Sequence, residues 1–325
     1  MMYALLAGGF VILLIGGDFM VRGAVALAQR LNVPPLVIGL TIIALGTSAP
    51  EFVVSIKSVM HDAPGLAIGN VVGSNIANIL LVLGLPAIIF PIACTGSSLN
   101  RDNLIMVLTS LLFIVFCWQG VLVSWQGGLF LLLLAGFLIH AYRAALRGDG
   151  ELAEAEDDFD GISSFPTSLM MSLFMIVAGM IGLILGAQML VDGAIDVARI
   201  FGVSEAVIGL TVVALGTSLP ELTTSLVAAM RKHADVAVGN VVGSNLFNIL
   251  GVIGATSLLM DVPVPAEVLK FDLWVMLAAS LALIPFAMRK AHIGRVTGTV
   301  FTIAYVAYIA VQFNDHGVQT AALGL

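Results

Sequence analysis

Long apolar stretches dominate this chain and leave few folds open to it. Ten of them are each close to the length of about 20 residues that a helix needs to cross a membrane. They lie near residues 3–29, 36–60, 65–90, 103–119, 126–146, 167–198, 206–230, 235–259, 268–288 and 296–313. Only 10% of the residues are charged, against about 25% in soluble domains. The short alternating strands of a membrane β-barrel are not visible. The sequence therefore predicts an all-α polytopic membrane protein with ten transmembrane helices.

Basic residues are unevenly divided between the two sides of these spans. We number the joints between spans along the chain, so that joint 1 follows the first span. The even joints carry three basic residues, Lys57, Arg199 and Lys270, and Arg22 lies within a span. The odd joints carry nine, namely Arg30, Arg101, Arg143, Arg147, Arg231, Lys232, Arg289, Lys290 and Arg295. Because basic joints stay in the cytoplasm, we expect the odd joints there and both termini outside.

Two segments of the sequence recur at one offset of 170 residues, without a gap. "IGLTIIALGTSAPE" at 38–51 matches "IGLTVVALGTSLPE" at 208–221 in 11 of 14 positions. "GNVVGSNIANIL" at 69–80 matches "GNVVGSNLFNIL" at 239–250 in 10 of 12 positions. Near-identity here, beside drift elsewhere in the two halves, is what a duplicated functional site would produce.

The repeat also predicts the architecture. Each half contains five spans, an odd number, so the second half enters the membrane upside down relative to the first. Inverted repeats of this kind are typical of secondary transporters, whose binding site lies at the midplane between the repeats. We expect repeats at 1–147 and 167–325, joined by an acidic cytoplasmic loop at 148–166.

The first repeated segment ends on a carboxylate that directly follows a helix-breaking proline. On a helix, Thr47 and Ser48 share a face with Glu51, since they lie four and three residues before it. Pro50 has no N–H and clashes with the carbonyl of Gly46, so the helix must kink or open there. Carbonyls freed at membrane depth require a polar partner such as an ion or water. The second copy repeats this arrangement with Thr217, Ser218, Pro220 and Glu221.

The second repeated segment adds a row of polar side chains at helical spacing. The rows are Asn70, Ser74 and Asn78 in the first copy and Asn240, Ser244 and Asn248 in the second. Glycines in the same segments, at 69, 73, 239 and 243, allow helices to approach closely. In the inverted architecture we expect all four segments to converge on one centre.

Oxygen is the only ligand type that these segments supply, which selects hard cations. Ca²⁺ accepts six to eight oxygens in flexible geometry, whereas Mg²⁺ demands a near-ideal octahedron and keeps its water. Two carboxylates neutralise one Ca²⁺, and an intramembrane glutamate without a role would be costly. By contrast, we expect acids at the joints and helix ends, such as Asp102 and Asp272, to be solvated.

The paired segments closely resemble those of the cation/calcium exchanger superfamily, in its sodium/calcium exchanger branch. That family carries two inverted repeats within ten spans, each with a "GTS-x-P-[ED]" helix and a "G-S-N" helix. The resemblance implies an antiporter, not an enzyme, that exchanges about three Na⁺ for one Ca²⁺ by alternating access. It implies the two ions and the lipid bilayer as partners, no cofactor, and one chain as sufficient. We expect a compact prokaryotic protein of the inner membrane.

The resemblance also implies roles for individual residues. Glu51 and Glu221 would be the main Ca²⁺ carboxylates, helped by the backbone carbonyls of Thr47 and Thr217. Asn78 and Asn248 would complete the centre, although some relatives, including potassium-dependent exchangers, carry an aspartate at the position of Asn248. The flanking Na⁺ sites would use Ser48, Ser218, Ser74, Ser244 and the carbonyls of Ala44 and Ala214.

Other functions stay open at this point. The H⁺/Ca²⁺ exchanger branch typically reads "GN-A-x-E" where this chain reads "GTSAPE" and "GTSLPE", and proton coupling is the main alternative. A passive cation channel could use the same ligands, but the inverted repeat and broken helices favour alternating access. The phosphate-binding pattern "G-x-x-x-x-G-K-[ST]" is absent from the sequence, and nothing indicates nucleic-acid binding.

Overall fold

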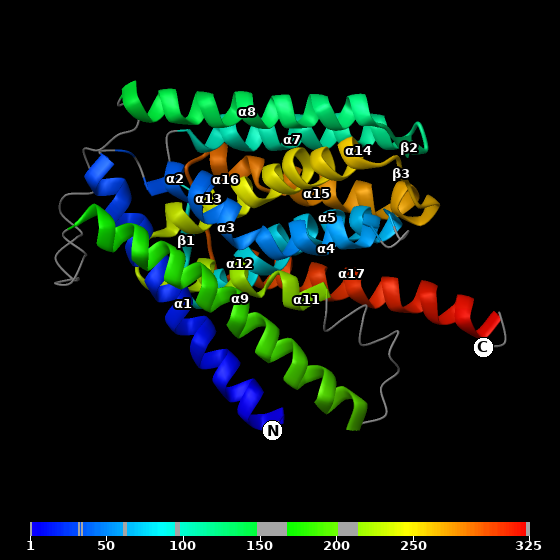
Figure 1. The fold of residues 1–325 in the computed structure, drawn as a ribbon, viewed down its shortest axis with the longest axis horizontal. Helices are drawn as coiled ribbons and strands as arrows, with labels where there is room; N and C mark the ends of the chain where they lie inside the picture. Colours follow the sequence, from blue (N-terminus) through cyan, green and yellow to red (C-terminus); the bar gives the residue numbers. More distant parts are fainter. Residues whose placement is uncertain are drawn as a thin grey trace.

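The computed structural model describes residues 2–31, 33, 35–60, 64–94, 98–147, 168–200 and 214–322, and is mostly helical there (Figure 1). The first half contains α1 (Met2–Leu31), α2 (Pro35–Ile38), η1 (Gly39–Ile43), α3 (Ala44–Thr47), α4 (Ala49–Met60), α5 (Pro64–Ala77), η2 (Asn78–Leu83), α6 (Gly84–Ile89), β1 (Ile92–Ala93), α7 (Leu99–Cys117), β2 (Val121–Leu122) and α8 (Ser124–Arg147), where η marks a π-helical segment.

The second half follows a similar order within the described residues, except that three segments stand where the first half has the single helix α7. Its elements are α9 (Leu169–Ile200), α11 (Ala214–Thr217), α12 (Leu219–Met230), α13 (Ala234–Leu246), η4 (Phe247–Ile253), α14 (Gly254–Leu259), β3 (Val262–Pro263), η5 (Val268–Asp272), α15 (Leu273–Ala282), α16 (Ile284–Met288), β4 (His292–Ile293) and α17 (Arg295–Ala322). The acidic loop expected at 148–166 lies outside the described residues.

The helices agree with the predicted spans in number and order. Within the described ranges, seven helices are long and apolar enough to cross a membrane, and a bent pair over residues 36–60 raises this to eight. The two remaining predicted spans correspond to α11–α12, whose described part begins at Ala214, and to α17. The ten-span arrangement therefore accounts for every helix that is described.

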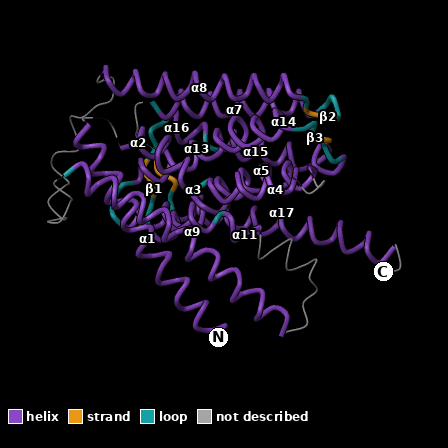
Figure 2. The backbone as a smooth tube through the Cα atoms, viewed as in Figure 1, coloured by secondary structure: helices purple, strands orange, loops and turns teal. Residues whose placement is uncertain are grey.

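Two short antiparallel ribbons connect the halves. β1 pairs with β4, with Ile92 opposite Ile293, and β2 pairs with β3, with Leu122 opposite Val262. The first ribbon joins joints 3 and 9 and the second joins joints 4 and 8, so odd joints meet odd joints and even meet even. Figure 2 shows β1 and the β2–β3 ribbon at opposite ends of the helical body, as ten membrane crossings require.

The first spans of the two halves, α1 and α9, pack antiparallel and lie side by side in Figure 1. Small residues bring their backbones together: a Cβ added at Gly9 would lie 2.8 Å from the carbonyl oxygen of Gly186. Asp18 of α1 forms an ion pair with Arg22 at 2.9 Å and another with Arg231, which follows α12. These ion pairs attach α1 to the end of a helix in the opposite half.

The expectation that Asp102 and Asp272 are solvated is wrong, because both carboxylates are buried. Helix α7 begins at residue 99, earlier than predicted, so Asp102 falls in its first turn, where the helix dipole favours a negative charge. Arg101 pairs with Asp102 at 3.0 Å. Asp272 accepts hydrogen bonds from the Tyr308 hydroxyl, at 3.1 Å, and from Gln312, both on α17. Each carboxylate is therefore compensated inside the protein.

Candidate ion-binding site

Both copies of the glutamate segment interrupt their helix at the serine. Ser48 has φ −82° and ψ 7°, and Ser218 has φ −88° and ψ 2°, in a sparsely populated region that many active-site residues occupy. The helices on either side of Ser48 are bent by 43°. Pro50 lies in the first turn of α4, where a missing N–H is tolerated. The predicted break is confirmed in both copies, although residues 208–213 of the second copy lie outside the described residues.

The two carboxylates are buried together, each against hydroxyls from the other half. Glu51 and Glu221 are each 1% exposed. The hydroxyl of Ser48 donates a hydrogen bond to Oε1 of Glu221 at 3.2 Å. The side chains of Thr217 and Ser74 contact Glu51, and the two glutamates are near enough to repel each other electrostatically. The expectation that the two copies converge is thus confirmed for their carboxylates.

Several oxygens at this centre are buried without a hydrogen-bond partner. They are Oε2 of Glu51, Oε2 of Glu221, Oδ1 of Asn78, Oδ1 of Asn248 and Oγ of Ser218. A buried polar atom left unpaired costs about 1–3 kcal/mol, and more when it is charged. Four of the five form pairs at the repeat offset. A hard cation would satisfy such a set, since two carboxylate oxygens and two amide oxygens are ligands of the kind Ca²⁺ prefers.

The described residues contain no group of three or more His, Cys, Asp and Glu side chains placed to hold a metal ion. The candidate ligands are therefore the two glutamates with neutral oxygens around them. Polar residues at positions 74 and 244, both buried, lie in the same region: the hydroxyl of Ser244 is 3.5 Å from that of Thr47. Since the Thr47 side chain also contacts Glu221, Ser244 lies one contact away from a carboxylate.

Two asparagines of the predicted polar rows, Asn70 and Asn240, form hydrogen bonds with neighbouring side chains. The amide nitrogen of Asn70 donates to the hydroxyl of Ser55 at 3.1 Å, and that of Asn240 donates to Ser225 at 3.4 Å. Oδ1 of Asn240 also accepts a hydrogen bond from the Thr47 hydroxyl at 3.1 Å. Asn240 therefore uses both ends of its amide to orient neighbouring side chains, while the amide nitrogen of Asn70 holds Ser55 and also lies 3.3 Å from the carbonyl of Glu51.

The carbonyls predicted as Na⁺ ligands are less clearly available. The carbonyl of Ala44 accepts the N–H of Ser48 at 3.0 Å, and the Thr47 hydroxyl lies 3.4 Å from it as an alternative to its shorter hydrogen bond with Asn240. Its repeat partner Ala214 is the first residue of α11. The roles of these carbonyls, and of those of Thr47 and Thr217, stay predictions.

Asn75 and Asn245 are two residues of this centre that the sequence analysis missed. Both are buried and both bind residues of the opposite half, as described below. A signal existed, because both belong to the identical "GNVVGSN" copies at the 170-residue offset. Just beyond them the helices change to π-helix, in η2 and η4, a distortion that is frequent at functional sites.

Comparison with known proteins decides the family. The family pattern described as "Sodium/calcium exchanger protein" matches residues 1–143 and 171–314. The chain belongs to the sodium/calcium exchanger family. It is 36% identical to a "Putative antiporter CaxA" of Alkalimonas amylolytica, over 94% of this chain and 97% of the relative. It is 34% identical to the "Sodium/calcium exchanger MaX1" of Methanosarcina acetivorans, over 96% of this chain and 98% of the relative.

A solved structure agrees with this membership. The sodium-calcium exchanger NCX_Mj, soaked with 2.5 mM Na⁺ and 0.1 mM Ca²⁺, matches with a TM-score of 0.81 and 35% identity. The match covers 95% of this chain and 97% of that one. The chain is therefore a polytopic membrane transporter with the exchanger fold and not an enzyme. Members of this family move ions as substrates, so the exchanger has no need of a cofactor.

Proposed function

We propose that this exchanger moves about three Na⁺ against one Ca²⁺, by alternating access at a site between the two repeats. The observation that carries the proposal is the set of buried, unpartnered oxygens contributed in pairs by the two halves. Charge favours Ca²⁺, because two carboxylates neutralise one divalent cation. The relative MaX1 and NCX_Mj are both sodium/calcium exchangers by name, which supports the same pair of ions.

In this proposal Glu51 and Glu221 bind Ca²⁺ through the oxygens that lack partners within the protein. The same carboxylates serve Na⁺ when Ca²⁺ is absent, which makes the two ions exclude each other and couples their movements. The remaining proposed ligands are Thr47, Thr217, Ser48, Ser218, Ser74, Ser244, Asn78, Asn248, Ala44 and Ala214.

The stoichiometry predicts that transport moves net charge. Two carboxylates with one Ca²⁺ sum to zero, while the same pair with three Na⁺ sums to +1. Asn248, being neutral, adds no third carboxylate that a proton or K⁺ would have to balance. One elementary charge across 100 mV corresponds to about 2.3 kcal/mol, which is roughly a 50-fold bias at equilibrium, since 1.4 kcal/mol is a factor of ten.

Uptake of ⁴⁵Ca²⁺ into proteoliposomes tests both the ions and the charge. We expect uptake with an outward Na⁺ gradient and none with an outward H⁺ gradient; uptake driven by H⁺ would instead indicate a proton-coupled exchanger. Valinomycin with a K⁺ gradient then sets the membrane potential. Uptake should be faster when the interior is positive, because three Na⁺ leave as one Ca²⁺ enters. Equal rates at both polarities would mean two Na⁺ per Ca²⁺ or a compensating proton.

We further propose that the protein lies in a prokaryotic inner membrane with both termini outside, and that its repeats are 1–147 and 167–325 with the cytoplasmic loop 148–166 between them. The nine-to-three division of basic residues supports this orientation. A variant lacking Cys94 and Cys117, with one cysteine placed in the loop, should resist impermeant thiol reagents added to intact cells. Labelling from outside would reverse the orientation.

A further inference from the structure

Asn75 and Asn245 hold each other across the boundary between the two repeats. The amide nitrogen of Asn75 donates to the backbone carbonyl of Asn245 at 3.2 Å, and that of Asn245 donates to the carbonyl of Asn75 at 3.3 Å. The two contacts are related by the 170-residue offset, so this pair lies at the point where the repeats meet.

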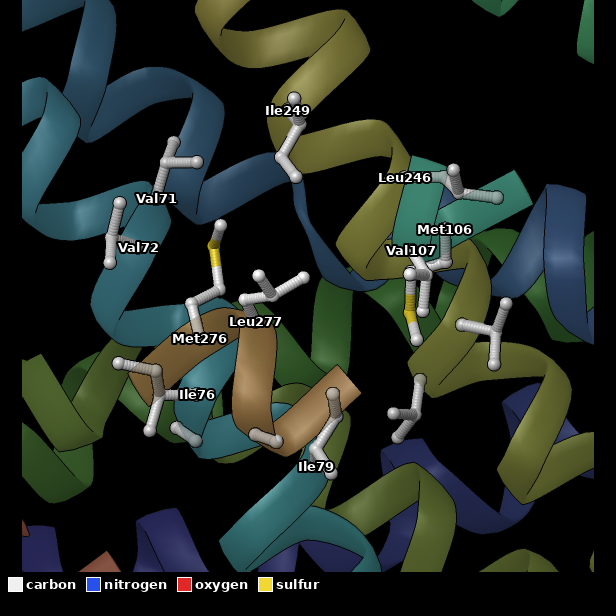
Figure 3. Packing of buried hydrophobic residues seen from close by; sticks show 14 of the residues in the cluster. Val71, Val72, Ile76, Ile79, Met106, Val107, Leu246, Ile249, Met276 and Leu277 are labelled. Atoms are coloured by element: carbon white, nitrogen blue, oxygen red, sulfur yellow. The ribbon is translucent and has the colours of Figure 1, made fainter. Parts of the chain in front are cut away.

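A methionine sulfur is the second hydrogen-bond acceptor for each of these amide nitrogens. The nitrogen of Asn75 also lies 3.8 Å from the sulfur of Met276, and that of Asn245 lies 3.6 Å from the sulfur of Met106. Figure 3 shows Met276 beside Ile76, and Met106 in the group around Leu246. Each amide nitrogen therefore has an acceptor for both of its protons. A rotated amide would set its oxygen against a carbonyl oxygen, so the orientation is fixed.

The side-chain oxygens of Asn75 and Asn245 also accept hydrogen bonds, each from an asparagine of the opposite repeat. Oδ1 of Asn245 accepts a hydrogen bond from the amide nitrogen of Asn78 at 3.0 Å. Oδ1 of Asn75 accepts one from the amide nitrogen of Asn248, also at 3.0 Å. With their nitrogens held, Asn78 and Asn248 leave Oδ1 as the free end of the amide, and these two oxygens are buried without a partner.

We infer that Asn75 and Asn245 are positioning residues that fix which end of the Asn248 and Asn78 amides faces the ions. Each acts on the ligand of the opposite repeat: Asn245 holds Asn78, and Asn75 holds Asn248. The inference rests on the proposed function, since it gives the two amide oxygens a role as cation ligands. Without the holding residue, an amide can turn its NH₂ group toward the site, where it would repel a cation.

Partners that orient a metal ligand typically contribute 10–100-fold to metal affinity. The test is the Ca²⁺ dissociation constant of the purified, detergent-solubilised protein, measured with ⁴⁵Ca²⁺ by equilibrium dialysis in Na⁺-free buffer. We expect Asn78→Ala and Asn245→Leu each to weaken binding about tenfold. The double variant should be no more than about twofold weaker than Asn78→Ala alone, because Asn245 acts only through Asn78.

The repeat supplies its own control. Asn245→Leu combined with Asn248→Ala should multiply to about a hundredfold loss, since those two residues do not contact each other through this bond. Likewise, Asn75→Leu should cause no further loss of Ca²⁺ affinity when it is combined with Asn248→Ala. Combined with Asn78→Ala, its loss of affinity should multiply with the loss that Asn78→Ala causes alone. A merely structural role would lower affinity equally in all backgrounds. Multiplicative losses in every combination would overturn the inference.

Two further variants keep the test decisive. Met106→Leu removes one acceptor from Asn245 at nearly constant volume, and should leave Ca²⁺ affinity within about twofold because the Asn75 carbonyl still holds that amide. If Asn245→Leu does not fold, as judged by gel filtration and thermal melting, Asn245→Ala replaces it with the same expected pattern. Unchanged affinity in Asn78→Ala would overturn the inference while leaving exchange intact; absence of Ca²⁺ binding in the unmodified protein would overturn the proposed function itself.

Discussion

The helices α5 and α13 carry the same seven residues, "GNVVGSN" at 69–75 and 239–245, and the two copies can be compared position by position. In α13 the glycines touch backbone: a Cβ at Gly239 would lie 2.6 Å from the carbonyl oxygen of Leu36, and one at Gly243 would lie 2.4 Å from that of Leu40. In α5 the equivalent glycines are Gly69 and Gly73, and the residues equivalent to Leu36 and Leu40, which are Ala206 and Leu210, lie outside the described residues.

The two heptapeptides are identical, so we predict that Gly69 and Gly73 allow the same close approach to the equivalent segment of the second half. In an inverted repeat, the two copies exchange surroundings when access switches from one side of the membrane to the other. A measured difference in how tightly the two copies pack would therefore report which side of the membrane the site faces.

The largest effect should be the same in both copies. Glu51→Gln and Glu221→Gln each remove one of the two charges that neutralise Ca²⁺, and each should abolish Ca²⁺ exchange. The measurement is ⁴⁵Ca²⁺ flux in proteoliposomes, with gel filtration in detergent to confirm folding. Near-normal exchange in either variant would contradict a site shared by the two repeats.

A matched pair of glycine variants tests whether the two copies pack alike. Gly243→Ala forces a methyl group against the backbone of Leu40 and should destabilise the protein by about 3 kcal/mol, visible as a lower melting temperature in detergent. Gly73→Ala is the equivalent change in the first copy and should lower the melting temperature by a similar amount, because the identical segment predicts the same close approach. A loss in Gly243→Ala alone would show that the two copies pack differently.

A smaller effect should come from the ion pair that only one half of the chain can form. Asp18 binds Arg22 and Arg231, while the residue at the repeat offset is Gln188, which is exposed. Asp18→Asn should cost about 1.5 kcal/mol, the lower end for a hydrogen bond to a charged group, because these side chains are partly exposed. Gln188→Ala is the control and should lie within about 0.5 kcal/mol of the unmodified protein.

The smallest effect should again be equal in both halves. Ser110 and Ser280 occupy equivalent positions, and each donates its hydroxyl at 2.9 Å to the carbonyl four residues earlier. Such bonds repeat what the helix backbone already provides. Each serine-to-alanine change should therefore shift the free energy of unfolding by less than about 0.5 kcal/mol. A large shift in one variant alone would reveal an asymmetry that the hydrogen bonds do not.

Hydropathy and the repeat predicted the spans, the inversion and the meeting of Glu51 with Glu221, because these depend on patterns within each half. Pro50 likewise fixed the helix break, since a missing N–H is a local property. Asn75 was missed because helical spacing singles out the row through Asn78 and leaves Asn75 beside it. Its importance comes from a carbonyl 170 residues away, which no local pattern contains.

Contacts between residues far apart in the sequence also explain the other differences between the predictions and the structure. Asp272 is buried because Tyr308 and Gln312, on another helix, bind it, whereas its position near a joint suggested exposure. The π-helical segments carry no residue type that distinguishes them from ordinary helix. The ribbons are two residues long per strand, too short for an alternating pattern. The burial of Asp272 depends on a contact within the second half, and the ribbons depend on contacts between the halves, but both join residues far apart in the sequence.

The ribbons also bear on how such a chain could have arisen. At the repeat offset, β1 corresponds to β3, since Ile92 matches Val262, yet β1 pairs with β4 and β3 with β2. Every described strand thus pairs with a strand of the opposite half. A chain of half this length would present one unpaired edge on each membrane face, and unpaired edges pair with another chain. Two copies inserted in opposite orientations would satisfy both edges, so a dual-topology dimer of half-length chains would already contain both ribbons before any gene fusion.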